Sequence, residues 1–138
     1  MDKALNYLAL ARKAGLAELG EEPVGAITRA GKGYLVLVAS DASDHTWRRA
    51  KSFVAGTSQC CVRLPFTKEE MGFVVGRTAL AIAAITDVSL ALALVNALGQ
   101  PDKHKEAIQV LTEKAQRLKQ RQKETKAHKR NVRTGKKK

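Results

Sequence analysis

The stretch GEEPVGAITRAGKGYLVLVASDAS, residues 20–43, decides the fold of this chain. Its run YLVLVA, residues 34–39, is too short for a free-standing helix and is mostly aliphatic or β-branched, which predicts a strand buried on both faces. Before the strand, Val24 and Ile27 lie three residues apart and Gly31 follows them, which predicts a short helix. A helix start behind a glycine-led polar loop offers backbone N–H donors, which suit a phosphate backbone.

Helical and strand patterns alternate through the rest of the chain. Helices are expected over residues 2–14, between Asp87 and Gly99, and over residues 102–122. A further helix should be capped by Ser43 or Asp44 and end at Gly56, and a short helix should begin with a capping box from Thr67 to Glu70 and end at Gly72. The further expected strands cover residues 16–19, 60–64 and 79–85, and the runs 34–39, 60–64 and 79–85 are each expected to be central. This order predicts an α/β fold, a three-layer α-β-α sandwich with a mixed sheet of about four strands, followed by a C-terminal basic helix and tail.

Charge divides the chain into two parts. The formal net charge is +12, and residues 101–138 hold 14 Lys and Arg against 4 Asp and Glu, whereas residues 1–100 are almost neutral. We therefore expect a sandwich domain over residues 1–100 and a basic extension over residues 101–138. Beyond Leu118, where the apolar stripe stops, we expect the chain to be disordered or helical only when bound. A basic extension on a neutral globule is typical of proteins that bind nucleic acid, and a merely solubilising tail is the alternative.

Several classes of protein find little support in the sequence. Cys60 and Cys61 form no disulfide framework, and no signal peptide pattern opens the chain, so a cytoplasmic protein is expected. The apolar segment 78–98 contains Asp87 and is interpreted as a strand and a helix, so no membrane partner is expected. The three histidines lie in polar contexts without a nucleophile or paired carboxylates, and no phosphate-binding glycine loop is present. We therefore expect no enzymatic activity, no metal and no cofactor.

Two loops are candidates for a binding site. They are Gly20 to Pro23 and Val75 to Thr78, and in a sandwich of this order both could lie at one end of the sheet. Four basic residues could join them there, although each taken singly is also readily explained as a solvated surface charge. These residues are Arg29, Lys32, Lys68 and Arg77.

A set of motifs resembles a known family. The stretches are LALARKAG, LGEEPVGAITRAGKGYLVLVASDAS, PFTKEEMG and VGRTALAIAAITD, in this order and spacing. They are similar to the kink-turn-binding ribosomal protein superfamily (the "L-seven-Ae" family), and within it to the bacterial YlxQ-like branch. The resemblance covers roughly residues 3–99 and implies an α-β-α sandwich that binds structured RNA at kinked internal loops without a cofactor.

The chain differs from this family in the loop that contacts RNA. When the chain is aligned without gaps to the family's recognition loop, the loop glycine corresponds to Gly20. The two polar positions of the loop are occupied by Glu22 and Pro23, and its lysine position by Ala26. Leu16 occupies the position of another lysine that often follows the first helix. The acidic side chain of Glu22, the missing hydrogen-bonding group at Pro23 and the missing lysines would weaken the family's usual contact with RNA. The cations of the basic extension could offset this loss. The residues expected to contact RNA are Gly20, Glu21, Glu22, Arg29, Lys32, Lys68, Gly76, Arg77 and Thr78.

The resemblance and the charge pattern lead to one expectation and one alternative. The expectation is a monomeric RNA-binding protein that associates with ribosomal RNA, the ribosome or another structured RNA. The alternative is a protein-interaction module on the same fold, with only non-specific polyanion binding through the tail. The two differ in whether the globule itself discriminates a kinked RNA from a plain duplex.

Overall fold

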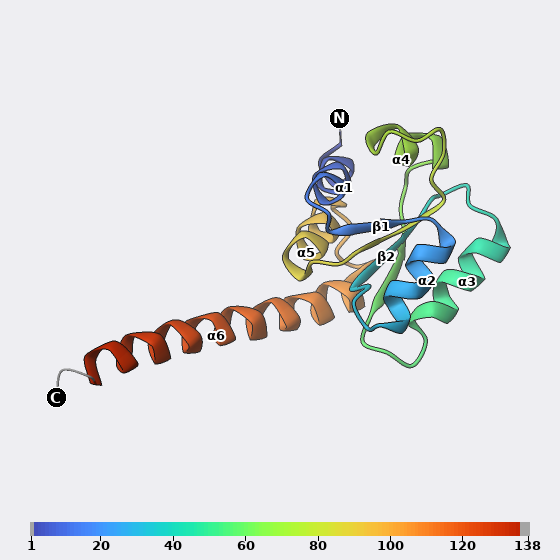
Figure 1. Cartoon of the computed structure of the whole chain (residues 1–138). Helices are drawn as coiled ribbons and strands as arrows, with labels where there is room; N and C mark the ends of the chain where they lie inside the picture. Colours follow the sequence, from blue (N-terminus) through green and yellow to red (C-terminus); the bar gives the residue numbers. More distant parts are fainter. Residues whose placement is uncertain (1, 136–138) are drawn as a thin grey trace.

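The computed structural model describes residues 2–135, with side chains described over residues 2–125 (Figure 1). The helices are α1 (Lys3–Lys13), α2 (Glu21–Arg29), α3 (Asp44–Val54), α4 (Lys68–Val74), α5 (Val88–Ala97) and α6 (Lys105–Gly135). The strands are β1 (Ala17–Leu19), β2 (Leu35–Val38), β3 (Cys60–Arg63) and β4 (Ile82–Ile85). Helices and strands thus alternate as predicted, apart from the final pair of helices.

The four strands form one mixed sheet in the order β1-β4-β2-β3. β2 pairs with β4 antiparallel and with β3 parallel, and all four of its residues are buried. β3 lies at the edge of the sheet, so the expectation that residues 60–64 form a central strand is wrong. The error has a physical reason. An apolar run indicates that helices cover both faces of a strand, but it does not indicate whether a second strand pairs with each of its two edges, because that pairing is made by backbone groups.

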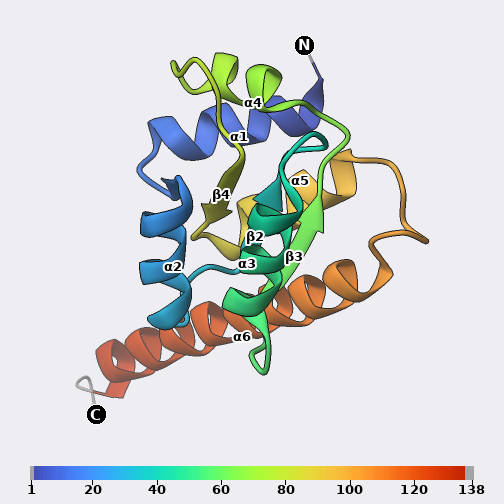
Figure 2. The ribbon, with the colours of Figure 1, turned by 90° about the vertical axis from the view of Figure 1, so that its right-hand side faces the viewer.

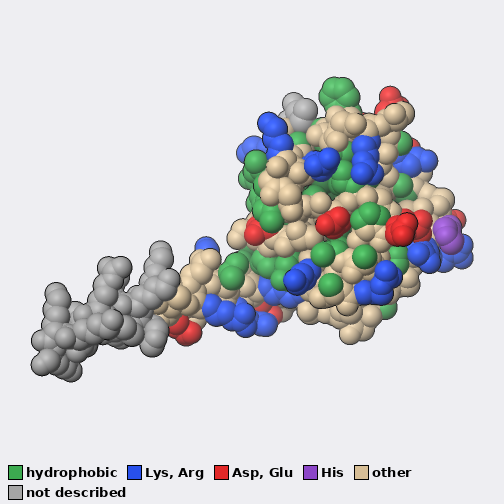
Figure 3. Space-filling view, viewed as in Figure 1, with side chains coloured by type: hydrophobic (Ala, Val, Ile, Leu, Met, Phe, Trp, Pro, Cys, Tyr) green, Lys and Arg blue, Asp and Glu red, His purple; other side chains and the backbone are tan. Residues whose placement is uncertain are grey.

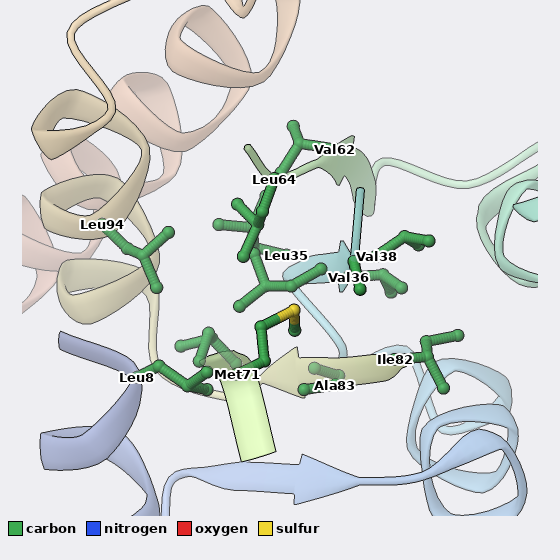
Figure 4. Close-up of a cluster of buried hydrophobic side chains, with 14 of the residues drawn as sticks. Leu8, Leu35, Val36, Val38, Val62, Leu64, Met71, Ile82, Ala83 and Leu94 are labelled. Carbon is green, nitrogen blue, oxygen red and sulfur yellow. The ribbon is translucent and has the colours of Figure 1, made fainter. Parts of the chain in front are cut away.

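Helices cover both faces of this sheet, which confirms the predicted three-layer sandwich (Figure 2). α2 and α3 pack against each other and against the strands on one face, while α1, α5 and the start of α6 pack on the other. The core joins these layers, with Leu8 of α1, Leu94 of α5 and Met71 of α4 directed toward Leu35 of the sheet (Figure 4). None of the helices described is both long enough and apolar enough to span a bilayer.

The predicted helix starts are confirmed in their hydrogen bonds. The Ser43 hydroxyl accepts from the Thr46 N–H, the Asp87 carboxylate accepts from the Leu90 N–H at 2.9 Å, and Thr67 forms the predicted capping box. The predicted end of α4 at Gly72 is wrong, because the helix continues to Val74.

Gly72 has a different role from ending a helix. A Cβ at this position would lie only 2.8 Å from the Arg77 carbonyl oxygen and 2.9 Å from Ala79 Cα. The glycine therefore allows the segment after α4 to return closely across the helix, which fixes the path of residues 75–79.

α6 joins the globule to the basic extension. Ala107 and Leu111 belong to the hydrophobic core and Ala115 is buried, so the globule extends past residue 100. Beyond Leu118 the helix leaves the globule and continues to Gly135, where the sequence led us to expect disorder or a helix only in the bound state (Figure 1). The residue types there, mainly Lys, Arg, Gln and Glu, are good helix formers and no proline interrupts them. The last three residues of the expected tail lie outside the described residues.

Candidate nucleic-acid interface

Four segments meet at one end of the sheet, which we call the Gly20 end. β1, β2 and β3 end there and β4 begins there. The Gly20 N–H donates to the Ile82 carbonyl oxygen at 3.0 Å, and the Lys68 N–H donates to Oδ1 of Asp41 at 2.8 Å. These contacts bring the start of α2, the loop after β2 and the start of α4 together.

Arg77 brings the second predicted loop to the same place. Gly20 is the N-cap of α2 with φ of 98°, a conformation that favours glycine, and it supplies no capping side chain. A Cβ at Gly20 would lie 3.9 Å from Nη1 of Arg77, so the guanidinium group lies beside the start of α2. The turn at Gly76, with φ of 75°, and a hydrogen bond from the Arg77 N–H to the Gly72 carbonyl at 2.9 Å place this arginine.

The Gly20 end is rich in carboxylates. The Glu21 carboxylate accepts a hydrogen bond from Nε of Arg49 at 2.7 Å, and both side chains remain partly exposed. The cations at this end include Lys68, Arg77, the paired Arg49 and Arg63, whose Nη2 donates to the Ala42 carbonyl oxygen at 3.0 Å. The acids on the segments that form it are Glu21, Glu22, Asp41, Glu69 and Glu70. A phosphate here would meet backbone donors and Arg77 in surroundings of mixed charge.

Two of the predicted site residues lie elsewhere. α2 runs away from the Gly20 end, which puts Arg29 about 12 Å along the helix from Glu21, at about 1.5 Å per residue. A Cβ at Gly25 would contact both Nη1 of Arg29 and the ring of Phe53, so this arginine lies toward α3. Lys32 follows in the turn that leads into β2, at the opposite end of the sheet. The structure thus does not bring Arg29 and Lys32 to the loops where they were expected.

At that opposite end lies a basic groove that sequence reasoning missed. It has a volume of about 250 Å³, and we call it the α6 groove. Nζ of Lys114 lies 5.1 Å from the centroid of the Tyr34 ring and donates to the Ser58 carbonyl oxygen at 2.9 Å. Burial lowers the pKa of Lys114. The lining residues are Tyr34, Thr86, Asp87, Val88, Lys114, Arg117, Leu118 and Arg121.

The spacing of the basic residues on α6 could have identified this groove. Lys114, Arg117 and Arg121 are three and four residues apart, which places them on one face of a helix. Arg117 has Glu113 as an exposed partner at 3.8 Å, an interaction that contributes little. Figure 3 shows Lys and Arg side chains gathered where α6 leaves the globule. The overall charge of the extension was recognised in the sequence, but its distribution over one face of α6 was not.

A second feature missed by sequence reasoning is an exposed aromatic ring. Phe73 on α4 is 77% exposed, the largest exposure among the large hydrophobic residues described. Its sequence context, KEEMGFVV, is that of a short amphipathic helix, which gives no sign that the ring faces solvent. An exposed ring can stack on a base or pack against a protein partner.

The cysteine and histidine side chains are the candidates for metal ligands and for reactive groups among the described residues. No cluster of three or more His, Cys, Asp or Glu with metal-binding geometry occurs among them. Burial raises the pKa of Cys61 to about 12, so this thiol stays protonated at neutral pH. Burial also lowers the pKa of His104 below its ordinary value of 6.5, and the charge of Lys103 lowers it further. The side chain of His128 lies outside the described residues.

The buried histidine predicts a pH dependence of stability. Because the folded protein holds the His104 pKa below that of the unfolded chain, the unfolded chain binds the proton first as the pH falls. We expect the contribution of His104 to the free energy of unfolding to be constant above about pH 6.5 and to fall below it, and His104→Leu to remove that part of the dependence. Urea melts between about pH 5.5 and 7.5 check this, and identical pH profiles of the two proteins would contradict it.

The fold defines the structural class of this protein as an α-β-α sandwich around a four-stranded mixed sheet. No protein-family model matches the sequence, and comparison with curated proteins gives no match. Among solved structures, a protein of unknown function from Bacillus halodurans C aligns with a TM-score of 0.67 at 22% identity, over 72% of this chain and 99% of that one. The 15.5 kD RNA-binding protein of Giardia lamblia aligns with a TM-score of 0.57 at 17% identity, over 70% of this chain and 82% of that one. At these identities the likeness establishes a shared fold.

Proposed function

We propose that this protein binds structured RNA, with α6 providing most of the attraction for phosphates. The observation that carries the proposal is the arrangement of cations on α6. Lys114, Arg117 and Arg121 line the α6 groove, and the exposed Lys119 and Lys123 add cations on the other side of the projecting helix. Phosphate contacts supply most of the affinity of such a protein for nucleic acid, and they act without sequence preference.

The fold supports RNA in particular. A solved structure with this fold is an RNA-binding protein, and the motifs at residues 19–43 and 75–87 resemble those of kink-turn binders. We further propose that the protein is a cytoplasmic, non-enzymatic component that associates with ribosomal or another structured RNA.

In this proposal the Gly20 end provides selectivity. The first turn of α2 leaves the backbone N–H groups of Glu21 and Glu22 without a side-chain cap, and the face formed by Glu22, Pro23 and Ala26 is open to solvent. Arg77 lies beside these donors and can reach one phosphate. The surrounding carboxylates repel phosphates, so contact at this end depends on how an RNA places one phosphate beside Arg77 and the α2 N–H groups.

The same carboxylates favour the alternative function, a protein-interaction module whose α6 binds polyanions without selectivity. Binding of the full-length protein to a kink-turn RNA and to a duplex of matched length distinguishes the two. Tighter binding of the kink-turn RNA supports the proposal, and equal dissociation constants support the alternative. Binding of neither RNA at low salt would overturn both assignments of α6.

Restoring the family's loop residues should strengthen RNA binding. The double change Pro23→Glu with Ala26→Lys adds a hydrogen-bonding group and a cation on exposed positions of α2, where the fold tolerates both. We expect the free energy of binding to a kink-turn RNA to improve by about 1–3 kcal/mol, the usual size of charge-assisted contacts. Equal affinity of the wild type and the double variant in a filter-binding titration would show that RNA does not contact this face.

A further inference from the structure

We propose that the free edge of β3 binds an acidic peptide segment of a partner protein, which adds to the sheet as an extended strand. A groove of about 710 Å³ runs along this edge between α3 and α6, and we call it the β3 groove. It contacts every residue of β3 and shares no lining residue with the α6 groove. The proposal is therefore independent of RNA binding.

The backbone of β3 is the first reason for a peptide. The Cys60 N–H donates to the Tyr34 carbonyl at 3.1 Å, and the Leu64 N–H donates to the Val38 carbonyl at 2.8 Å, both toward β2. Because alternate residues of a strand address opposite neighbours, the N–H and C=O groups of Cys61 and Arg63 face away from β2. No strand of the described chain pairs with this side. A row of free groups at strand spacing matches the backbone of another extended peptide.

The walls of the groove suit alternating side chains. Trp47 and Val54 of α3 form one wall, and Ala107 and Val110 of α6 form the other. β3 itself lies between the helices and contacts both α3 and α6. Successive side chains of an added strand would point to the two walls in turn.

Charge complementarity identifies the partner as acidic. The cations that line the groove are Lys51, Arg63 and Lys103, and the only carboxylate among its lining residues is Glu106. Burial keeps His104, another lining residue, largely neutral at pH 7. Carboxylates at neighbouring positions of the added strand point to opposite sides and would thus meet an excess of positive charge on both sides of the groove.

The occupied ring of Trp47 argues against a nucleic acid strand in this groove. The Arg63 guanidinium and the Lys51 ammonium each lie 5.3 Å from the centroid of the Trp47 ring. Single-stranded nucleic acid is held by aromatic faces that are free to stack on bases, and this ring already carries two cations. A sugar-phosphate chain can accept from single N–H groups, but it does not offer N–H and C=O groups in alternation at strand spacing, as an extended peptide does.

Direct binding to a synthetic probe tests the proposal. The probe is a fluorescent, acetylated and amidated octapeptide of sequence Glu-Glu-Thr-Val-Glu-Glu-Thr-Val, which places Glu on both sides of an extended strand, titrated with the full-length protein. The comparison probes are the same peptide with Lys for Glu, the acidic peptide with alternate amides N-methylated, and an octauridylate. We expect only the unmodified acidic peptide to bind well. Equal binding of the basic or the N-methylated peptide, or tighter binding of the octauridylate, would overturn strand addition by an acidic peptide.

Charge reversals locate the binding site. Lys51 and Lys103 are both exposed, so the double variant Lys51→Glu with Lys103→Glu should fold normally. We expect it to weaken binding of the acidic peptide by about tenfold, since two attractive pairs become repulsive. The matched control, Lys3→Glu with Lys13→Glu on α1, changes the net charge equally and should leave the affinity nearly unchanged. Equal losses in the two double variants would mean that the peptide does not bind in the β3 groove.

Amide hydrogen exchange reports on the backbone contact itself. In the free protein the amides of Cys61 and Arg63 should exchange much faster than the amide of Val62, and bound peptide should slow them by about tenfold or more. A purely electrostatic contact would not change this exchange. Equally slow exchange of all three amides in the free protein would show that the β3 edge is already paired, and the proposal would fail.

Discussion

Replacing Val36 with Asp is expected to unfold the protein. Val36 is fully buried in β2, the strand that pairs with both β4 and β3, so the carboxylate would have neither water nor a cation to compensate its charge. An unpaired buried charge costs several kcal/mol, which is comparable with the whole stability of a domain of this size, about 5–15 kcal/mol. Ile82→Asp in β4, where the side chain is 2% exposed, should behave in the same way.

Thermal and urea melts followed by circular dichroism measure this loss. Leu10→Asp on α1 is the matched control, because it also replaces an aliphatic residue with an acid but at a position that is 51% exposed. We expect the control to melt close to the wild type. A melting temperature of Val36→Asp within a few degrees of the wild type would show that residue 36 is not in a central strand.

The sequence was most informative where burial and local hydrogen bonding decide the structure. The run at 34–39 predicted β2 because a strand covered on both faces needs consecutive apolar side chains and the run is too short for a free-standing helix. The cap at Asp87 and the capping box at Thr67 were predictable because both form within a few residues of chain.

The errors arise where structure depends on distant parts of the chain. The position of β3 at the sheet edge, the close approach at Gly72 and the path of α2 away from the Gly20 end all depend on contacts between segments far apart in sequence. The Gly20 end itself was predicted in part, since Gly20 and Arg77 do lie together. Arg29 and Lys32 were placed wrongly because the sequence shows that these residues are basic but does not show toward which end of the sheet α2 carries them.

α6 shows how charge and packing combine in one element. Its first turns bury Ala107, Leu111 and Ala115 against the globule, and the same helix then presents Arg121 and Lys123 to solvent. Deleting residues 101–138 would therefore uncover the core as well as remove the cations. A test of the electrostatic role must change charges within the full-length chain.

We expect the triple change Lys119→Gln, Arg121→Gln and Lys123→Gln to weaken RNA binding strongly and to lower its salt dependence. If about six cations of α6 and the following tail meet phosphates, log K for the wild type should fall with log salt at a slope near −5, about a thousandfold loss between 50 and 200 mM. Removing three of these contacts should flatten the slope by about 2 to 3 and weaken binding at low salt on the order of a hundredfold. All three side chains are exposed, so the fold should be unaffected.

The control for this prediction removes the same charge from the globule. Lys3→Gln, Lys13→Gln and Arg48→Gln change exposed positions on α1 and α3 and should leave the slope nearly unchanged. Both triple variants should keep whatever preference the wild type has for a kink-turn RNA over a matched duplex, because phosphate contacts set affinity whereas shape or base contacts set selectivity. Titrations of all three proteins across the salt range would decide where the attraction resides. An unchanged slope in the α6 variant would place the phosphate contacts on the globule, and equal flattening in both variants would mean that RNA responds only to the net charge.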